Sequence, residues 1–239
     1  MRVISYNLRK HAARGELEQL VASHTPNLLC LQEVDTDDLP RELGPLTLAD
    51  ATWLNRLGLA IFYDRERFEA LSTQAFSLKR SLHDIIAKPA LERLLGSHLV
   101  DRKHDRELVV GCFHAAPLTA LNSLRRTQIR AAHEALDSFG SHLPTLMVGD
   151  FNYPLFKDHL STSVHETGHE VTLSDARTYT RYKFFRGHFD FATSIGLSIT
   201  KVTTLPQGQS DHLPIFVTAD YAAERSNADE PSGADETPR

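Results

Sequence analysis

Two oxygen-bearing side chains stand two residues apart at the end of an apolar run. Residues 143–148 are followed by Gly149-Asp150-Phe151-Asn152. In extended backbone, residues i and i+2 point to the same side, so the Asp150 carboxylate and the Asn152 amide can face one ligand. A hard cation such as Mg²⁺ takes oxygen ligands of this kind. Gly, Asp and Asn also favour turns, so the segment predicts either a strand-ending turn or part of a metal site.

Other apolar runs of the chain also end in side chains that suit a metal or a phosphate. These end residues are Asn7, Gln32-Glu33 and His114, and Ser210-Asp211-His212 precedes a further strand-like run. Each group taken alone could be a turn cap, a solvated strand end or an interior histidine. Their recurrence at successive strand ends of one domain favours a shared site, where carboxylates would hold a metal and histidines would exchange protons.

Most of the elements that must position these residues are predicted to be strands. Helical spacing of leucines indicates helices over residues 15–24 and 119–136. The strand-like segments are 2–6, 28–31, 59–63, 108–113, 145–148, 189–192 and 215–218. The later part of the chain is strand-rich, which favours an α/β sandwich of packed sheets over a doubly wound sheet.

Two regions have a different pattern. The apolar residues of 82–106 predict one or two helices interrupted by Pro89, followed by a basic stretch. We expect one domain over residues 1–221 and a disordered acidic tail over residues 222–239, which has no hydrophobic periodicity. The tail carries a net charge of −3, leaving −2 of the chain's −5 on the domain. This balance argues against coating nucleic acid by bulk attraction, and it allows a local basic cleft.

The composition is that of a soluble globular protein, with 41% hydrophobic and 24% charged residues. No apolar run approaches the roughly 20 residues that cross a bilayer, and the N-terminus has no signal-peptide pattern. Cys30 and Cys112 lie in apolar runs, which favours buried free thiols and a reducing compartment, although the sequence leaves a disulfide open. We expect a cytoplasmic monomer with no membrane partner.

As a set, the motifs resemble those of the endonuclease/exonuclease/phosphatase superfamily, which includes deoxyribonuclease-I-like nucleases. The matching segments are 5–7 (Ser-Tyr-Asn), 31–34 (Leu-Gln-Glu-Val), His114, 149–152 and 210–212. They occur in the family's order and cover residues 1–219, nearly all of the predicted domain. The resemblance implies a four-layer α/β sandwich, with two packed mixed β-sheets flanked by helices and the site at one end.

The resemblance also implies a role for each oxygen-bearing residue. Mg²⁺, with Mn²⁺ as a substitute, would be held mainly by Glu33, with Asn7 and Asp211 helping. Asp150 would position or deprotonate the attacking water, and Asn152 would fix the phosphate or that water. A Lewis acid suits this chemistry because negative charge builds on the phosphoryl oxygens during attack.

Three more residues complete the implied site. His212 would act as general base or stabilise the transition state, and His114 would support phosphate charge or protonate the leaving group. Asp190 would accept a hydrogen bond from His212 and set its tautomer. In the deoxyribonuclease-I-like branch, a carboxylate before the strand matching 59–63 partners the first histidine. Residues 54–58 contain no carboxylate here, so another group must orient His114.

Two enzyme functions fit this resemblance. The first is a Mg²⁺-dependent nuclease or nucleic-acid phosphodiesterase, and the alternative is a phosphatase or phosphodiesterase of a small-molecule or lipid head-group phosphate. The chain lacks the large insertions and apolar hairpin of the lipid branch. A catalytically silent binding module is a third alternative, but it should have lost Glu33, Asp150 or His212, and all three are present.

Nucleic acid is the favoured substrate because basic and aromatic residues alternate over 177–186, where they could grip phosphates and stack bases. An amphipathic strand with its aromatics packed inward is the other interpretation of that stretch. Arg126 and Arg130 share a helical face and either steer phosphate or form a solvated surface. Three histidines in an irregular region indicate surface positions rather than a zinc site: His159, His165 and His169.

Overall fold

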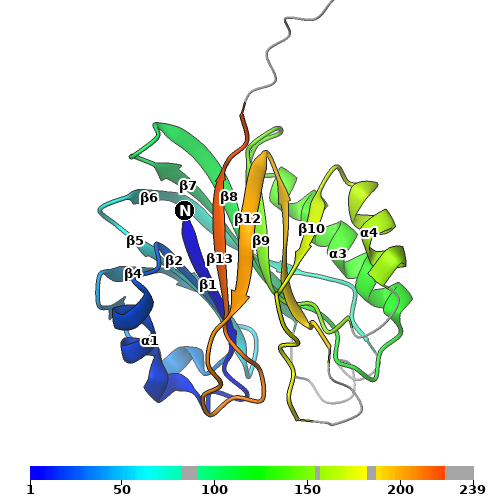
Figure 1. Cartoon of the computed structure of the whole chain (residues 1–239), viewed down its shortest axis with the longest axis horizontal. Helices are drawn as coiled ribbons and strands as arrows, with labels where there is room; N and C mark the ends of the chain where they lie inside the picture. The colour runs from blue at the N-terminus through cyan, green and yellow to red at the C-terminus, as the bar shows by residue number, and fades with distance from the viewer. Residues whose placement is uncertain (82–90, 154–156, 182–186, 224–239) are drawn as a thin grey trace, which may run out of the picture.

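Two β-sheets packed face to face form the centre of the molecule (Figure 1). The structure is a computed structural model that describes residues 1–81, 91–153, 157–181 and 187–223. Within these residues the larger sheet has the strand order β12-β13-β1-β2-β5-β4-β3 and the smaller sheet β10-β11-β9-β8-β7-β6. Both sheets are mixed, because β1 and β2 run parallel, as do β8 and β9, and the other neighbours are antiparallel.

The strands have the following bounds. The larger sheet is built from β1 (Arg2–Asn7), β2 (Leu28–Val34), β3 (Glu42–Leu43), β4 (Leu46–Ala51), β5 (Gly58–Asp64), β12 (Leu197–Thr204) and β13 (Ile215–Tyr221). The smaller sheet is built from β6 (Phe68–Ser77), β7 (Glu92–Asp101), β8 (Arg106–His114), β9 (Thr145–Asp150), β10 (Glu170–Leu173) and β11 (Asp190–Ile195).

Alternation along the strands divides the apolar residues among separate cores. Leu28 and Cys30 of β2 point into the layer between the sheets, whereas Leu29 and Leu31 point to the outer face. Alternate strand residues face opposite sides of a sheet, so both faces of β2 are apolar and both must be covered. Burial of this area is the main term that favours the packed state.

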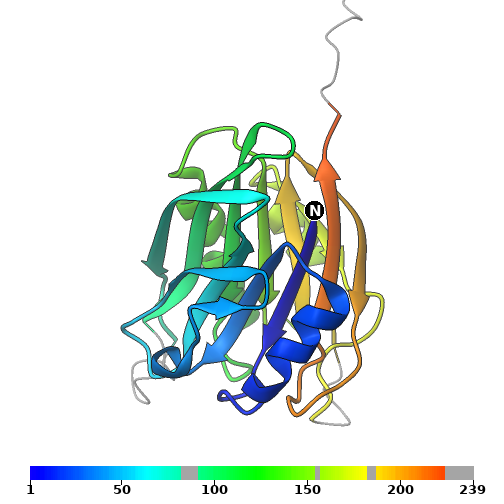
Figure 2. The ribbon, with the colours of Figure 1, turned by 90° about the vertical axis from the view of Figure 1, so that its left-hand side faces the viewer.

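Helices cover the two outer faces (Figures 1 and 2). Helix α1 (Leu17–His24), which follows a 3₁₀ turn at Arg14–Glu16, buries Leu17 and Val21 against the larger sheet. Helices α3 (Asn122–Asp137) and α4 (Lys157–His165) cover the smaller sheet. A second 3₁₀ turn spans Thr36–Asp38. The predicted four-layer sandwich is confirmed.

Both predicted helices and all the predicted strand segments are present. The helical prediction for 82–106 is wrong over its described part, because β7 occupies Glu92–Asp101. Leu94 and Leu95 are consecutive and face opposite cores, as neighbouring residues of a strand do. The i, i+3, i+4 spacing of Leu91, Leu94 and Leu95 also fits a helix, which explains the wrong prediction. Residues 82–90 lie outside the described residues, as does nearly all of the predicted tail.

The two cysteines are buried and free, as predicted. None of the described helices is long and apolar enough to cross a membrane.

The surface prediction fails for one of the three histidines. His159 and His165 are exposed, but His169 is buried and its ring stacks on that of His133, with centroids 3.7 Å apart and planes 6° apart. His133 bonds to the hydroxyls of Thr167 and Thr193 at 2.8 and 2.9 Å. One hydroxyl can accept and the other donate, which suits a neutral imidazole. Burial lowers the pKa of both histidines.

This buried pair predicts an acid-sensitive stability. Because the folded pKa values lie below the unfolded value of about 6.5, the folded state binds fewer protons, and stability falls as pH drops below about 6.5. We expect His169→Phe, which keeps the ring and removes one titrating group, to weaken this pH dependence. Urea unfolding at about pH 7.5 and about pH 5.5 measures it. His165→Phe on the exposed surface is the control, and equal pH dependence in both variants would contradict the prediction.

Candidate active site

The ends of five strands bring the predicted site residues to one end of the sandwich. Asn7 ends β1 beside Gln32 of the parallel strand β2. In the other sheet, His114 ends β8 opposite Asp150 of the parallel strand β9, and Asp190 begins β11 on the other side of Asp150. The carboxyl ends of parallel strands meet at the same sheet edge, which explains why residues far apart in sequence converge here.

The Ser210-Asp211-His212 segment is tied to this edge by its own hydrogen bonds. The Ser210 hydroxyl donates to the Asn7 carbonyl at 2.7 Å and accepts from the His212 backbone N–H at 3.1 Å. Tyr179 forms an isolated β-bridge with His212, and the two rings lie 4.9 Å apart. His212 is therefore fixed on two sides before β13 begins.

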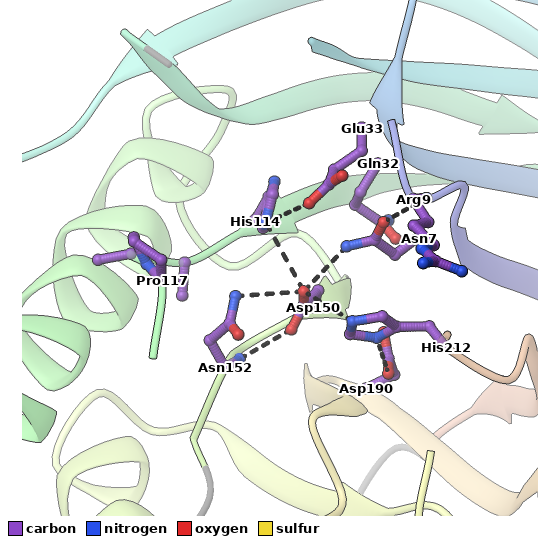
Figure 3. Close-up of polar contacts among 12 residues, drawn as sticks. Asn7, Arg9, Gln32, Glu33, His114, Pro117, Asp150, Asn152, Asp190 and His212 are labelled. Atoms are coloured by element: carbon purple, nitrogen blue, oxygen red, sulfur yellow. Dashed lines mark hydrogen bonds and ion pairs between the residues drawn. The ribbon is translucent and has the colours of Figure 1, made fainter. Parts of the chain in front are cut away.

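Asp150 is the hub of the site (Figure 3). Its Oδ1 accepts from the backbone N–H of Asn152 at 2.9 Å. Its Oδ2 accepts from the side-chain amides of Asn7 at 3.0 Å and Asn152 at 3.2 Å. The same oxygen lies 3.6 Å from Nε2 of His114 and 3.7 Å from Nε2 of His212. Asn7 Oδ1 in turn accepts from the Arg9 backbone N–H, so the Asn7 amide is held toward Asp150.

Asp190 and His212 form a close buried pair. Nδ1 of His212 lies 2.8 Å from Oδ2 of Asp190, as predicted from the sequence. Burial opposes the charged imidazole, but the Asp190 and Asp150 carboxylates outweigh it and raise the pKa of His212 to about 10. At neutral pH, His212 is thus a cation whose Nε2–H points toward Asp150.

The pKa values of Asp150 and His114 both shift in the direction that favours the neutral form of the side chain. Burial, reinforced by Asp190 and Glu33 and opposed by His212, raises the pKa of Asp150 to about 7. Burial lowers the pKa of His114 to about 4, with Arg93 adding to the effect and Glu33 opposing it. A carboxyl with a pKa near neutrality is a base poised for proton transfer, and His114 is neutral at the same pH.

Glu33 reaches the site through a strained backbone. It sits at a β-bulge, where the pairing of β2 with β5 shifts between Gln32 and Val34, and its φ is 55°. A bulge re-aims the side chain, and a positive φ in a non-glycine residue is a conformation that surrounding structure must enforce. The neighbouring segment Arg9 to His11 also has three positive φ values. From this segment the Lys10 backbone N–H donates to Glu33 Oε2 at 2.7 Å and holds the carboxylate in place.

The donor set fits a hard cation at Glu33. Its Oε1 lies 4.0 Å from His114 Nε2, and no lysine or arginine of the described residues makes an ion pair with it. Asp150 and Asp211 add carboxylate oxygens to the same cavity, so negative charge is concentrated there, and oxygen ligands of this type suit Mg²⁺. Asp150, Asp190 and His212 also have potential ligand atoms within 4.8 Å of one another, but Nδ1 of His212 and Oδ2 of Asp190 already bond to each other.

The site opens into a cavity of about 840 Å³ whose rim carries cations. Arg9 Nε and Arg181 Nη1 lie 3.7 and 3.8 Å from the Asp211 carboxylate, and Lys10 lines the same space. Arg93, which the sequence reasoning missed, is buried and donates to the carbonyls of His114 and Ala115 at 3.0 and 2.8 Å. These two partners are backbone atoms, which leave no sequence signal.

The helix arginines do not reach the cavity. Arg125 is buried and donates to the carbonyls of Ala116 and Pro117. Arg126 donates to the Tyr153 hydroxyl, and Arg130 pairs with Glu166. Neither Arg126 nor Arg130 is among the residues that line the cavity, so the structure favours the solvated-surface interpretation of this pair.

The basic and aromatic stretch 177–186 is only partly described. Tyr179 is buried against Phe189 and His212, which fits the inward-packing interpretation. Arg181 lines the cavity. Residues 182–186 lie outside the described residues.

Comparisons with known proteins give one family match and many similar folds. The model of the endonuclease/exonuclease/phosphatase family matches residues 4–212. Protein angel of Drosophila melanogaster is 28% identical over 160 residues, which is 62% of this chain and 44% of that protein. The chain thus spans less than half the length of this curated relative.

Two solved structures illustrate the shared fold. A mannosyl-6-phosphatase of Bacteroides thetaiotaomicron superimposes with a TM-score of 0.73 at 18% identity, covering 92% of this chain and 100% of that one. D. rerio TDP2 in complex with a single-strand DNA product gives a TM-score of 0.70 at 15% identity, covering 92% and 98%. At these identities the likeness concerns the fold. With the family model matching most of its length, the chain belongs to the endonuclease/exonuclease/phosphatase family, a family of phosphoester hydrolases.

Proposed function

We propose that this chain is a Mg²⁺-dependent phosphodiesterase that acts on nucleic acid. The observation that carries the proposal is the array in which Asp190 holds cationic His212 beside Asp150. When water attacks an anionic diester, the reaction needs a base with a pKa near neutrality and a fixed cation next to that base.

The electrostatics favour one division of roles. Asp150 takes the proton of the attacking water while the new oxygen–phosphorus bond forms and the bond to the leaving oxygen breaks, and the leaving oxygen takes a proton from solvent water. His212 is already protonated, so it neutralises charge on the phosphoryl oxygens and does not serve as the base. His114 is neutral and contributes a hydrogen bond, and Asn152 orients the phosphate.

Glu33 would hold the Mg²⁺, for which Mn²⁺ could substitute, with Asn7 and Asp211 placing its water shell. When bound there, the ion supplies Lewis-acid stabilisation of the charge that builds in the transition state. The protein's own part is to keep Glu33 aimed into the cavity, which the Lys10 N–H and the bulge in β2 accomplish.

Nucleic acid is supported as the substrate by the cations at the rim. Arg9, Lys10 and Arg181 border a cavity whose base is acidic, so successive phosphates of a polymer would meet positive charge on the way to the metal. We further infer that the protein works as a monomer in the cytoplasm. The free buried thiols of Cys30 and Cys112 support a reducing compartment.

The test is hydrolysis of bis-p-nitrophenyl phosphate and of a substrate panel with Mg²⁺. We expect activity that EDTA removes and that His212→Ala lowers by about 10³-fold. His165→Ala, on the exposed face of α4, is the matched control and should retain activity. Activity that survives both EDTA and His212→Ala would refute the proposal.

The panel contains plasmid DNA, single-stranded DNA, RNA, abasic duplex and inositol phosphates. We expect cleavage of at least one nucleic acid and none of the inositol phosphates. Cleavage of the small phosphates alone would establish the alternative, a phosphatase of a small-molecule or lipid head-group phosphate.

A further inference from the structure

A histidine that the proposed mechanism does not use is bonded to the segment that carries Glu33. His11 belongs to the loop that follows β1, and its side chain is only 15% exposed. Its backbone N–H donates to the Glu33 carbonyl at 2.9 Å. Its Nδ1 accepts from the Asp35 backbone N–H at 3.0 Å, and its Nε2 lies 3.1 Å from Oδ2 of Asp38. His11 therefore contacts the chain on both sides of Val34, where β2 ends.

This bonding pattern decides which ring nitrogen of His11 carries a proton. A backbone N–H can only donate, so Nδ1, which faces the Asp35 N–H, is the bare and accepting nitrogen. The proton of the neutral ring then lies on Nε2, which donates to the Asp38 carboxylate. The imidazole thus joins the end of β2 to the 3₁₀ turn at Thr36–Asp38.

The backbone on both sides of this contact is strained. Arg9, Lys10 and His11 have φ values of 47°, 54° and 69°, and Glu33 has a φ of 55°. Residues with a Cβ disfavour this left-handed region, so contacts with the surrounding structure have to hold it. The two bonds of the His11 ring are contacts of this kind, because they tie the left-handed segment to Asp35 and Asp38.

The left-handed segment acts directly on the Glu33 carboxylate. The Lys10 backbone N–H donates to Oε2 of Glu33 at 2.7 Å, so the protein engages that oxygen. Oε1, which lies 4.0 Å from Nε2 of His114, is the oxygen that remains to face a cation in the cavity. If the His11 ring released the end of β2, the segment could relax, and the Lys10 N–H would move away from the carboxylate.

We propose that His11 is a positioning residue of the metal site. Its imidazole holds the segment Arg9 to His11 against the end of β2 and so aims the Glu33 carboxylate at the cation. The inference rests on the proposed function, because it takes Glu33 as the metal ligand. Removal of a group that orients a metal ligand typically weakens metal binding by about 10–100-fold.

Binding of Mn²⁺ to the metal-free protein, followed by electron paramagnetic resonance of the free ion, tests the inference. We expect His11→Ala to weaken Mn²⁺ binding by about tenfold or more. His11→Asn should restore most of the affinity, because its Oδ1 can accept from the Asp35 N–H in place of Nδ1 and asparagine tolerates a left-handed φ. His11→Gln carries its amide toward Asp38 instead and should bind Mn²⁺ as weakly as His11→Ala.

Arg14→Ala is the matched control. Arg14 Nε also lies 3.3 Å from the Asp38 carboxylate, but within the described residues its side chain makes no bond to residues 33–35. An exposed ion pair of this kind contributes little, so the variant should bind Mn²⁺ as the wild type does. Weakened binding in Arg14→Ala equal to that in His11→Ala would overturn the inference, because loss of any contact to Asp38 would then explain the effect.

The dependence of activity on Mn²⁺ concentration is a second measurement. His11→Ala should need more Mn²⁺ for half-maximal activity, whereas its kcat at saturating Mn²⁺ should fall much less than its affinity. A general distortion of the site would lower kcat at saturation as well, and that result would overturn the inference. Mn²⁺ affinity equal to wild type in His11→Ala would overturn it too, as would equally weak binding in His11→Ala and His11→Asn.

The wild-type protein provides a test that does not depend on the folding of His11→Ala. A long-range ¹H–¹⁵N NMR spectrum, assigned by difference from that of His11→Asn, should show a protonated Nε2 and a bare Nδ1 for His11. The opposite tautomer would overturn the inference, because Nδ1 could not then accept from the Asp35 N–H.

Glu33→Ala separates this inference from the proposed function. If the wild-type protein binds no Mn²⁺, or if Glu33→Ala binds it as tightly as the wild type does, the metal site and the inference fail together. If Glu33→Ala loses Mn²⁺ binding while His11→Ala keeps the wild-type affinity, the inference fails and the proposed function stands.

Discussion

Asp150→Asn is expected to lower kcat for a phosphodiester by about 10³-fold or more. The change removes the base, and it also replaces one hydrogen bond by two opposed donors, whichever way the new amide points. An NH₂ group at the Oδ2 position would face the side-chain amides of Asn7 and Asn152. An NH₂ group at the Oδ1 position would face the Asn152 backbone N–H. Steady-state kinetics with bis-p-nitrophenyl phosphate measure the loss.

A matched control separates chemistry from folding. Asp158→Asn changes an exposed carboxylate on α4 and should leave kcat unchanged. The thermal unfolding of Asp150→Asn should stay cooperative, since the substitution is isosteric. A variant that keeps a tenth or more of the wild-type kcat would contradict the assignment of Asp150 as the base.

Gly149→Ala is expected to destabilise the fold by about 4 kcal/mol or more. The φ of Gly149 is 153°, and a Cβ there would lie 1.9 Å from the carbonyl oxygen of Phe113 in the neighbouring strand β8. That contact is with backbone, so no side-chain rotation relieves it, and β8 and β9 would have to separate. His114 and Asp150 follow these two residues directly, so the site would be displaced as well.

Urea unfolding measures this effect, and Gly15→Ala is its control. A Cβ at Gly15 meets nothing within 4 Å, so that variant should match or slightly exceed the wild-type stability. A Gly149→Ala variant within about 1 kcal/mol of wild type would show that the two strands tolerate the added carbon.

The sequence predicted that these residues gather at one end of the fold because they lie at strand ends. Apolar runs are readable from composition, and the polar residue that ends each run is fixed by the register of its neighbours. Asn7 and Asp150 are placed by that rule, and Asp190 begins its strand opposite Asp150. The sandwich was also predictable from the apolar runs. A strand with apolar residues on both faces needs a packed layer on each side of its sheet.

Other features depend on contacts that leave no local pattern. Arg93 bonds to backbone carbonyls, and any sequence offers carbonyls. The bulge at Glu33 follows from a positive φ that its side chain does not favour, so tertiary contacts decide it. His169 looked like a surface residue because its stacking partner, His133, lies far away in the chain. The strand β7 was hidden because Leu91, Leu94 and Leu95 also have the i, i+3, i+4 spacing of a helix.

The site lies across the seam between the two sheets. Asn7 and Glu33 come from the larger sheet, His114 and Asp150 from the smaller one, and the Asn7–Asp150 hydrogen bond crosses between them. Each sheet alone would carry half of the groups. Activity therefore depends on the packing of the two sheets against each other. A molten state that kept its strands but let the sheets shift relative to each other would be inactive. Enzyme activity would report the integrity of the central core earlier than far-ultraviolet circular dichroism could.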